Sequence, residues 1–336
     1  MRIVPQHTLP QAAPPKPASN RLPGDMPELR SEWLRSATAT IVMLLVLCLL
    51  AGCHRSSKQA AAPAAADAST PAPRIVCTVP AITQILLQIG AASDLKGVSS
   101  FDAPLLPKSL RNLPVVGDYE HIDYETLAAL EPTIIIIQIA PLRVPPALPS
   151  FALTHHAKLL DVSLTSLADI AHNARLLGRL THRQKQAAAA IARMEQQLSQ
   201  LATQKPAKPV RVLYLISRQP MMAVGADNFQ DQLIRAAGGM NVGAKLGSGY
   251  PTLNRETLVQ LRPQVLVIDA PGSLVSQGPD DPRLAGFFSL PIPAAKTGRI
   301  YLLTNMKNDL PTLAVGSTAQ RLRKLFYPPP ATGGTP

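Results

Sequence analysis

Aromatic residues are scarce in this chain of 336 residues, which has one Trp, six Tyr and six Phe. The sequence has no basic stripe with interleaved aromatic residues, so we expect no nucleic acid partner. The net charge of +12 is nevertheless high. A basic surface favours an anionic ligand or an anionic membrane, and solubility alone accounts for the charge equally well. Few aromatic side chains are therefore available to hold a ligand.

Sequence motifs of several enzyme classes are also absent. The chain has no Gly-x-Ser-x-Gly, His-Glu-x-x-His, phosphate-binding glycine loop or dinucleotide fingerprint. The stretch Gly247-Ser-Gly249 is isolated and indicates only a flexible loop. We therefore expect a protein that is not an enzyme. A hydrolase or a chelatase-like enzyme stays as an alternative, because an α/β fold can also host catalysis.

A long apolar run lies near the start of the chain. Residues 37–50 follow Arg30 and Arg35 and are too few to span a bilayer comfortably, which is typical of a signal peptide. The run ends in Leu50-Ala-Gly-Cys53, which resembles the bacterial lipoprotein signal and implies cleavage before Cys53 and lipidation of that residue. An uncleaved transmembrane anchor is the alternative. Both interpretations place the rest of the chain outside the cytoplasm, held at a membrane.

The chain has only three cysteines. Cys48 leaves with the signal peptide and Cys53 takes lipid, so Cys77 remains alone and no disulfide can form within one mature chain. Cys77 lies in a predicted strand that starts at Arg74, and we expect it to be a small buried hydrophobe. A catalytic cysteine needs surroundings that lower its pKa, and the sequence near Cys77 provides none.

Two segments of the chain match one another without a gap. Asp123 and Asn254 each begin a segment as a helix N-cap, and each is followed by Glu-Thr-Leu, a further Leu, a helix-ending Pro and four branched apolar residues. An apolar run of this kind after a helix stop is typical of a fully buried parallel strand. The match between residues 123–138 and 254–269 therefore predicts two similar α/β halves.

A helix without Gly or Pro is predicted between these segments, over residues 181–203. Thr181 and Gln184 match a capping box, and apolar residues follow at spacings of three and four. The predicted fold class is α/β, with two Rossmann-like lobes with parallel sheets joined by one long rigid helix, so we expect only small rotations of the lobes. The predicted parts are an N-terminal extension with a signal peptide (1–52), a disordered tether (53–73), a first lobe (74–180), the connecting helix (181–204), a second lobe (205–327) and a disordered tail (328–336).

Several motifs occur in order along the first lobe. They are Arg74-Ile-Val-Cys-Thr-Val-Pro-Ala-Ile-Thr-Gln-Ile-Leu86, Gly90, Lys96-Gly-Val-Ser-Ser100, Leu113-Pro-Val-Val-Gly117 and Glu125-Thr-Leu-Ala-Ala-Leu-Glu-Pro132. Their combination resembles the vitamin B12 and ferric-siderophore binding proteins of bacterial ABC importers, over about residues 74–326. The resemblance implies a class III periplasmic binding protein of the helical-backbone metal receptor type. Such a protein captures a metal chelate between its lobes and delivers it to an ABC permease with its ATPase.

The resemblance also implies roles for two glutamates. In this family, one Glu near the start of the repeat helix in each lobe docks on arginines of the permease, and the matching positions are Glu125 and Glu256. A Glu at a helix start also stabilises the helix against its macrodipole without any partner. The implied transported ligand is cobalamin, a ferric siderophore or haem, with no intrinsic cofactor, and we expect a monomer.

The predicted ligand site lies where the carboxyl ends of the two sheets face each other, as in other open α/β sheets. Tyr119 and Tyr250 match positions where cobalamin-binding members place aromatic residues, whereas Met222 replaces one. Arg218 is suited to a carboxylate, a phosphate or a siderophore oxygen. The full set of candidates is Phe101, Tyr119, Gln138, Arg218, Met222, Tyr250 and Asp269.

Three other ligand classes or roles stay open. Haem-binding relatives carry an axial Tyr directly after Val-Gly, where this chain has Asp118 and then Tyr119. Capture of a free metal ion needs ligands from both lobes, but the second lobe has no His and offers only carboxylates such as Asp227, Asp269 and Asp309. We therefore predict no metal-binding residues. A lipoprotein that serves as a sensor or scaffold without transport is the remaining alternative.

Overall fold

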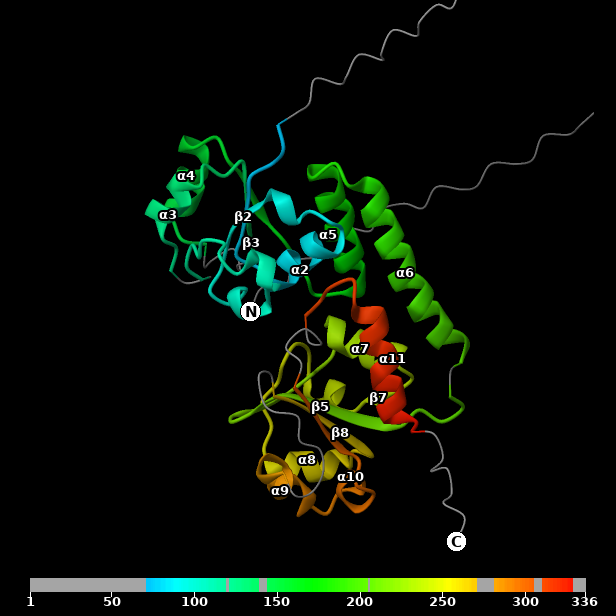
Figure 1. Ribbon diagram of the computed structural model, residues 1–336. Helices are drawn as coiled ribbons and strands as arrows, with labels where there is room; N and C mark the ends of the chain where they lie inside the picture. Colours follow the sequence, from blue (N-terminus) through cyan, green and yellow to red (C-terminus); the bar gives the residue numbers. More distant parts are fainter. Residues whose placement is uncertain are drawn as a thin grey trace, which may run out of the picture. The chain divides into compact units, whose positions relative to one another are not determined.

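The computed structural model describes residues 71–118, 121–138, 144–204, 206–270, 281–304 and 310–328 (Figure 1). All of these residues belong to one compact unit, Ser69–Pro336. The predicted signal peptide, Cys53, and nearly all of the predicted tether and tail lie outside the described residues. Among the helices in the described ranges, none is long and apolar enough to cross a membrane.

Four parallel strands form the first sheet, in the order β2-β1-β3-β4. Every residue of β1 and β3 is buried, as expected for central strands that are covered on both faces. The strands are β1 (Ile75–Cys77), β2 (Leu95–Val98), β3 (Ile134–Ile137) and β4 (Lys158–Asp161). The helices of this N-terminal half (residues 71–180) are α2 (Pro80–Gln88), α3 (Tyr124–Ala129), α4 (Ala147–Thr154) and α5 (Leu167–Leu180).

The second sheet is built around β5 (Arg211–Arg218), which has two partners along one side. The start of β5 pairs in parallel with β7 and its end pairs antiparallel with β6, while β8 and then β9 follow in parallel on its other side. These strands are β6 (Met221–Ala223), β7 (Met240–Asn241), β8 (Val265–Asp269) and β9 (Ile300–Leu303). The helices of this C-terminal half (residues 206–328) are α7 (Phe229–Ala236), α8 (Arg255–Leu261), α9 (Pro282–Phe288), α10 (Pro293–Lys296) and α11 (Val315–Phe326).

The two halves share one topology. The order β7-β5-β8-β9 repeats the order β2-β1-β3-β4, with α3 before β3 and α8 before β8. The predicted α/β fold with two similar halves is therefore confirmed. The parallel sheets need one correction, because β6 runs antiparallel to the end of β5. No counterpart of β6 exists among the described strands of the N-terminal half.

The repeated helices begin as the sequence predicts. The Asp123 side chain accepts hydrogen bonds from the backbone N–H groups of Glu125 and Thr126, each at 3.1 Å. In the other half, the Asn254 side chain accepts one from the Thr257 N–H at 2.8 Å. Both caps satisfy N–H groups that have no partner within their own helix. Glu125 and Glu256 consequently occupy the same second helical position.

The same two helices also end alike. Arg74 donates from Nη2 to the Leu130 carbonyl at 2.8 Å, and Arg211 donates from Nη2 to the Leu261 carbonyl, the equivalent position of the repeat. Each arginine comes just before or at the start of its strand, and each guanidinium also reaches the next carbonyl through Nε, at 3.1 Å and 3.2 Å. These bonds satisfy carbonyl groups that a helix end leaves open. The internal match therefore reflects a shared way of joining helix to strand.

The connecting helix α6 (Gln184–Thr203) starts later than predicted. Thr181 does not cap it, because its hydroxyl donates to the Leu177 carbonyl at 2.8 Å and so belongs to the end of α5. Arg183 stands at the N-cap of α6 without a capping side-chain bond, and its Nη1 is 2.6 Å from Asp94 Oδ2. Because this ion pair is mostly buried, it holds the turn between α5 and α6 against the first half.

The connecting helix is also not the only link between the halves. Helix α6 packs along α5 and α11, as Figure 1 shows. Gln232 Oε1 accepts a hydrogen bond from the Leu167 N–H at 3.0 Å, and Gln88 Oε1 accepts one from the Leu313 N–H at 3.1 Å. Each bond joins a residue of the N-terminal half to one of the C-terminal half.

A shared hydrophobic core explains the close packing of the halves. Side chains alternate between the two faces of a strand, and in both sheets one face contributes to a core that includes residues from α2, α5, α6, α7 and α11. In β3, for example, Ile134 and Ile136 enter this shared core, whereas Ile135 and Ile137 enter a core confined to the N-terminal half. The other face of the second sheet packs in a core confined to the C-terminal half. We call the two cores that are confined to one half the private cores. The branched apolar runs therefore supply side chains both to a private core and to the shared core.

Candidate functional site

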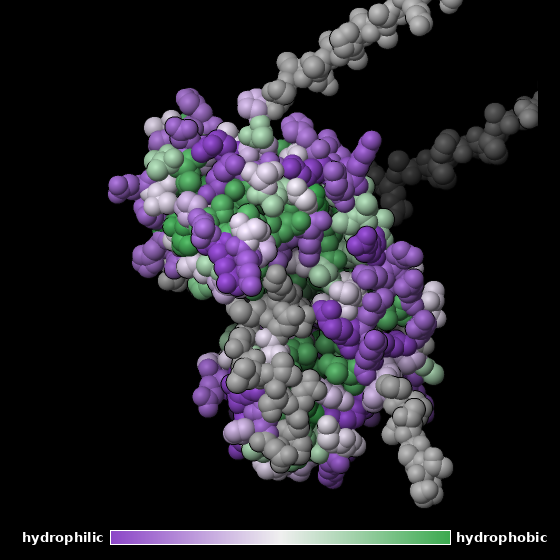
Figure 2. Space-filling view, viewed as in Figure 1, coloured by the Kyte–Doolittle hydropathy of each residue, from purple (hydrophilic) through white to green (hydrophobic). Residues whose placement is uncertain are grey.

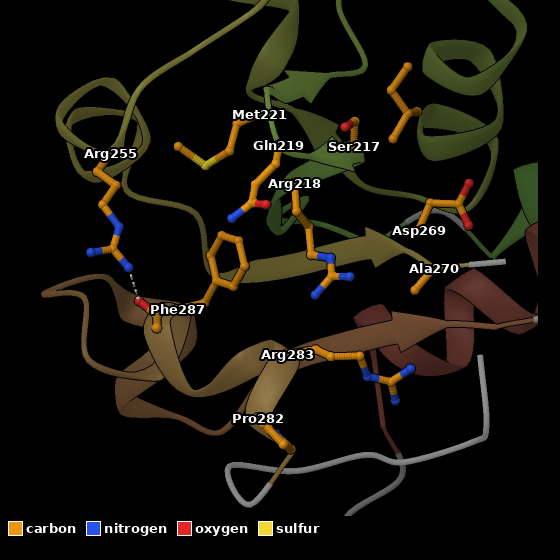
Figure 3. Close-up of a pocket in the computed structure, with 12 residues that line it drawn as sticks. Ser217, Arg218, Gln219, Met221, Arg255, Asp269, Ala270, Pro282, Arg283 and Phe287 are labelled. Atoms are coloured by element: carbon orange, nitrogen blue, oxygen red, sulfur yellow. Dashed lines mark hydrogen bonds between the residues drawn. The ribbon is translucent and has the colours of Figure 1, made fainter. Parts of the chain in front are cut away.

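A cavity of about 780 Å³ lies in the C-terminal half, at the carboxyl ends of β5 and β8 (Figure 3). This is the edge where ligands bind in open α/β sheets. Arg218 is the last residue of β5 and Asp269 is the last residue of β8. Helix α9 forms another wall. The lining consists of Ile216, Ser217, Arg218, Gln219, Met221, Arg255, Asp269, Ala270, Pro282, Arg283, Gly286 and Phe287.

Two of the three arginines in the cavity are held by the protein. Arg283 makes a two-bond pair with the buried Asp281, with Nε to Oδ1 at 2.9 Å and Nη2 to Oδ2 at 2.5 Å, and this pairing raises the pKa of Arg283. Arg255 donates from Nη2 to the Gly286 carbonyl at 3.0 Å, which ties the start of α8 to α9. Both guanidinium groups are thereby fixed in the wall of the cavity.

Apolar side chains stand beside these charges. Phe287, Met221 and Ile216 line the same cavity, and Figure 3 shows the Phe287 ring next to the Arg218 side chain. A cavity with apolar walls and a few placed polar groups is typical of a small-molecule site. The arrangement suits a ligand with an apolar body and an oxygen-bearing polar group.

Of the predicted ligand-site residues that the structure describes, Arg218 and Asp269 are the two that line the cavity. Met222 lies outside the lining, and its strand neighbour Met221 lies within it, because side chains alternate along β6. Gln138 follows β3 at the repeat position equivalent to Asp269 and is exposed. Tyr119 lies outside the described residues. Every described residue that lines the cavity therefore belongs to the C-terminal half.

Tyr250 lies apart from the cavity, in the same half. Its hydroxyl donates to Gln230 Oε1 at 2.7 Å, and burial raises the pKa of Tyr250. Asn228 Nδ2 donates to the Gly249 carbonyl at 2.9 Å and holds the preceding loop residue. Tyr250 as a whole remains 38% exposed.

Phe101 is presented by a turn with a buried acid. Asp102 is fully buried, and its Oδ2 accepts hydrogen bonds from the Ser99 N–H at 3.1 Å and from the Ser99 hydroxyl at 2.5 Å. Burial raises the pKa of Asp102. Phe101 itself is 45% exposed. More generally, hydrophobic side chains on the face shown in Figure 2 form patches that are separated by hydrophilic ones. The turn fixes Phe101 at the surface of the N-terminal half.

The free thiol of Cys77 offers no reactive group. Cys77 is completely buried in β1, and burial raises its pKa to about 12. Because the thiolate is the nucleophilic form of cysteine, this residue packs as a small hydrophobe. Among the described side chains, no group of three or more His, Cys, Asp and Glu could hold a metal ion.

Comparison with known proteins identifies the family. Residues 75–306 match the family model described as periplasmic binding protein. The chain belongs to the periplasmic binding protein family. The predictions of family and fold class are thereby confirmed, and so is the prediction that the chain is not an enzyme, because this family consists of substrate-binding proteins.

Individual relatives of this periplasmic binding protein are moderately similar. A vitamin B12-binding protein of Vibrio parahaemolyticus is 27% identical over 201 residues, which cover 59% of this chain and 71% of the relative. The solved periplasmic haem-binding protein HutB of Vibrio cholerae has a TM-score of 0.64 at 23% identity, covering 76% of this chain and 99% of HutB. The vitamin B12-binding protein BtuF of Vibrio cholerae has a TM-score of 0.62 at 21% identity, covering 76% and 97%. The likeness to these structures concerns the fold.

Membership in the family settles several coarser predictions. A periplasmic binding protein acts outside the cytoplasm, captures a solute and works with an ABC permease. The two glutamates predicted to dock on the permease are both exposed, each at the second position of its helix. Their side chains are therefore accessible at equivalent places in the two halves.

Sequence reasoning did not name Arg255, Arg283 or Phe287 as site residues. Arg255 precedes Glu256 in the repeat, but its counterpart Tyr124 is aromatic, so the repeat gave no sign of a second cation. Tyr124 packs against Phe151 of α4, with ring centroids 5.5 Å apart, whereas Arg255 bonds to α9. A helix after the strand meets the start of the repeat helix in both halves, by apolar contact in one and by a hydrogen bond in the other.

Proposed function

We propose that this periplasmic binding protein is a membrane-anchored lipoprotein that captures a metal chelate and delivers it to an ABC permease with its ATPase. The chelate is cobalamin, haem or a ferric siderophore. The carrying observation is the cavity at the carboxyl ends of β5 and β8, on a fold shared with vitamin B12-binding and haem-binding proteins. The chelate is cargo, and no intrinsic cofactor is proposed.

The test is binding and identification of the cargo. The full chain, purified with a tag from its own cells, is examined by its visible spectrum and by metal analysis. Thermal unfolding is then followed with cyanocobalamin, haem or a ferric siderophore. A ligand that binds only the folded state stabilises it by about 2.7 kcal/mol at a hundredfold excess over Kd. If none of the three classes shifts the transition and no chelate copurifies, the proposal is wrong.

Permease docking through Glu125 and Glu256 is part of the proposal. Both side chains are exposed and equivalent by the repeat, so the pair offers one acidic contact from each half. The combined variant Glu125→Arg with Glu256→Arg should bind ligand normally and lose transport in vesicles that hold the permease. Glu195→Arg, which changes an exposed Glu on α6, is the control for the charge reversal. Transport that survives in the double variant would refute the docking role.

Lipid attachment at Cys53 completes the proposal. The sequence Leu50-Ala-Gly-Cys53 supports it. The proposed division of the rest is a first lobe from residue 74, the connecting helix α6 (Gln184–Thr203) and a second lobe at 205–327. The protein with Cys53 intact should partition into a detergent phase, and Cys53→Ser should stay in the aqueous phase. We propose that the anchored protein acts as a monomer. A sedimentation experiment in detergent that gives a dimer would contradict this part alone.

A further inference from the structure

The cavity in the C-terminal half carries an excess of positive charge. Three guanidinium groups line it, and two carboxylates oppose them, Asp269 in the lining and Asp281 bonded to Arg283. Three positive charges against two negative charges leave one positive charge among these described groups. A positive charge in a partly enclosed site attracts an anion more strongly than the same charge in open water, because the effective dielectric constant of the site is lower.

The three arginines differ in what they bind within the protein. Arg283 is committed to Asp281, and Arg255 donates to the Gly286 carbonyl. Arg218 makes no hydrogen bond or ion pair with its side chain within the described ranges. Its five N–H donors are therefore open to a ligand, and they present the fork that matches a carboxylate or a phosphate.

The position of Arg218 is fixed although its guanidinium is free. Arg218 pairs with Met221 in the hairpin of β5 and β6, so its backbone is held at the edge of the sheet. Figure 3 shows the side chain extending into the space between Phe287 and Arg283. The strand end thus places a cation next to an apolar ring, with little backbone freedom to lose on binding.

We propose that Arg218 binds an oxyanion, a carboxylate or phosphate oxygen, on the ligand of this protein, while Phe287 and Met221 contact an apolar part of the same ligand. This inference rests on the proposed function and names the chemical class of the cargo. The cargo is a metal chelate that carries an oxyanion beside an apolar surface. Arg255 and Arg283 are positioning residues that hold the wall formed by α9 and α8.

The test uses pairs of metal chelates that differ in the oxyanion. Haem has two carboxylates that are esterified in haem dimethyl ester, and cyanocobalamin has a phosphodiester that dicyanocobinamide lacks. A neutral ferric trihydroxamate is the fifth probe. Each probe is titrated into the full chain in detergent, as wild type, Arg218→Gln, Arg218→Lys and Arg193→Gln. Arg193 is an exposed arginine on α6 and controls for the lost charge.

We expect Arg218→Gln to weaken binding of the oxyanion-bearing probe about tenfold to a hundredfold, as the loss of a charged hydrogen bond does. The member of each pair that lacks the oxyanion should bind wild type and Arg218→Gln alike. Arg193→Gln should behave as wild type, and Arg218→Lys should lie between wild type and Arg218→Gln. Unchanged thermal unfolding of Arg218→Gln shows that the fold is intact, since the side chain has no partner among the described residues.

Other outcomes separate the two proposals. If wild type binds haem or cyanocobalamin and Arg218→Gln binds it equally well, Arg218 is not the oxyanion contact, and the proposed function stands. If wild type binds the neutral trihydroxamate and neither oxyanion-bearing probe, the ligand class is wrong, and capture of a chelate stands. If wild type binds no probe, the proposed function fails and this inference fails with it.

Discussion

The two halves of this protein share a scaffold and differ at one edge. In both, the capped helix of the repeat ends at an arginine that stands at or just before the first strand of the same half, and the strand order is the same. In the N-terminal half, β1 ends at Cys77 and α2 starts at Pro80. In the C-terminal half, β5 ends at Arg218 and α7 starts only at Phe229, with β6 between them.

This difference shows where the halves have specialised. The helix-to-strand joint is the same in both halves because its geometry depends on carbonyl groups that must be satisfied wherever a helix ends. The carboxyl edge is free to differ, because a longer strand and a hairpin can be added there without disturbing the core. The added hairpin carries Arg218 and Met221 into the cavity. Scaffold and site are thus separable in this fold.

The largest effects should come from the private cores. Leu127 and Leu258 are equivalent residues of the repeat and are buried in the N-terminal and C-terminal private core. Leu127→Ala and Leu258→Ala should each lower the free energy of unfolding by about 2–5 kcal/mol, through lost burial and the cavity left behind. Urea unfolding followed by far-ultraviolet circular dichroism measures this change.

The shared core also determines how many unfolding transitions these variants should show. Because one face of both sheets packs in the same core, we expect a single cooperative transition in wild type and in both variants. Leu153→Ala, at a side chain 79% exposed, is the control and should change stability little. Two separate transitions in either core variant would mean that the halves unfold independently and that the shared core is weaker than its burial indicates.

The arginines at the helix ends should have smaller and matched effects. Arg74→Met and Arg211→Met keep an unbranched apolar stem and remove the donors to the carbonyls of Leu130 and Leu261. Each should destabilise the protein by about 1.5–3 kcal/mol, the range for a hydrogen bond with a charged partner. Chemical denaturation of both variants side by side measures the match. A large effect of one and none of the other would break the equivalence of the halves.

The scaffold could be predicted because its causes are local in sequence. The N-caps Asp123 and Asn254, the Pro that ends each helix and the branched runs act within a few residues. The capping box at Thr181 failed for the opposite reason, since the Thr hydroxyl found the carbonyl of the helix before it. A Thr between two helices satisfies the same local pattern in either direction, and only the backbone geometry decides.

The candidate site was harder to predict because distant contacts make it. Arg218 and Asp269 could be named from their place after predicted strands. The residue chosen on β6 was Met222, and Met221 lines the cavity, because one residue of register moves a side chain to the other face. Arg255 became a wall residue through Gly286 on α9, and no sequence pattern links those two residues. Arg283 pairs with Asp281, two residues before it at the N-cap of α9, but this local pair does not by itself place the helix at the cavity.

The junction of the halves should show a modest effect. Gln88 and Gln232 each accept a backbone hydrogen bond from the opposite half. Gln88→Met and Gln232→Met should each lower the free energy of unfolding by about 1 kcal/mol, and together they should loosen the junction. The X-ray scattering profile of wild type should change little when ligand is added, because two hydrogen bonds and a shared core join the halves in addition to α6. A large compaction of wild type on binding would contradict a rigid junction.

The smallest effect concerns charge, in which the edges of the halves differ most. The N-terminal half buries Asp102 after β2, whereas the C-terminal half leaves the Arg218 side chain without a described partner at the end of β5. Because burial raises the pKa of Asp102, the folded state binds its proton more tightly than the unfolded chain does. The stabilisation by this proton is complete below the ordinary Asp pKa and is lost as the pH rises through the raised pKa.

Asp102→Asn removes this proton equilibrium while keeping an oxygen that accepts from Ser99. Its stability, measured by urea unfolding at a series of pH values, should therefore fall less than that of wild type as the pH rises from acid toward neutral. Parallel wild-type and Asp102→Asn curves would mean that the buried carboxyl titrates alike in the folded and unfolded states and that the edges do not differ in this way.

Asp169 gives the opposite case. Burial acts to raise its pKa, but hydrogen bonds, chiefly from Thr165, outweigh burial and lower the pKa. The stability of wild type should therefore decrease as the pH falls through the lowered pKa, and Asp169→Asn should reduce this loss of stability.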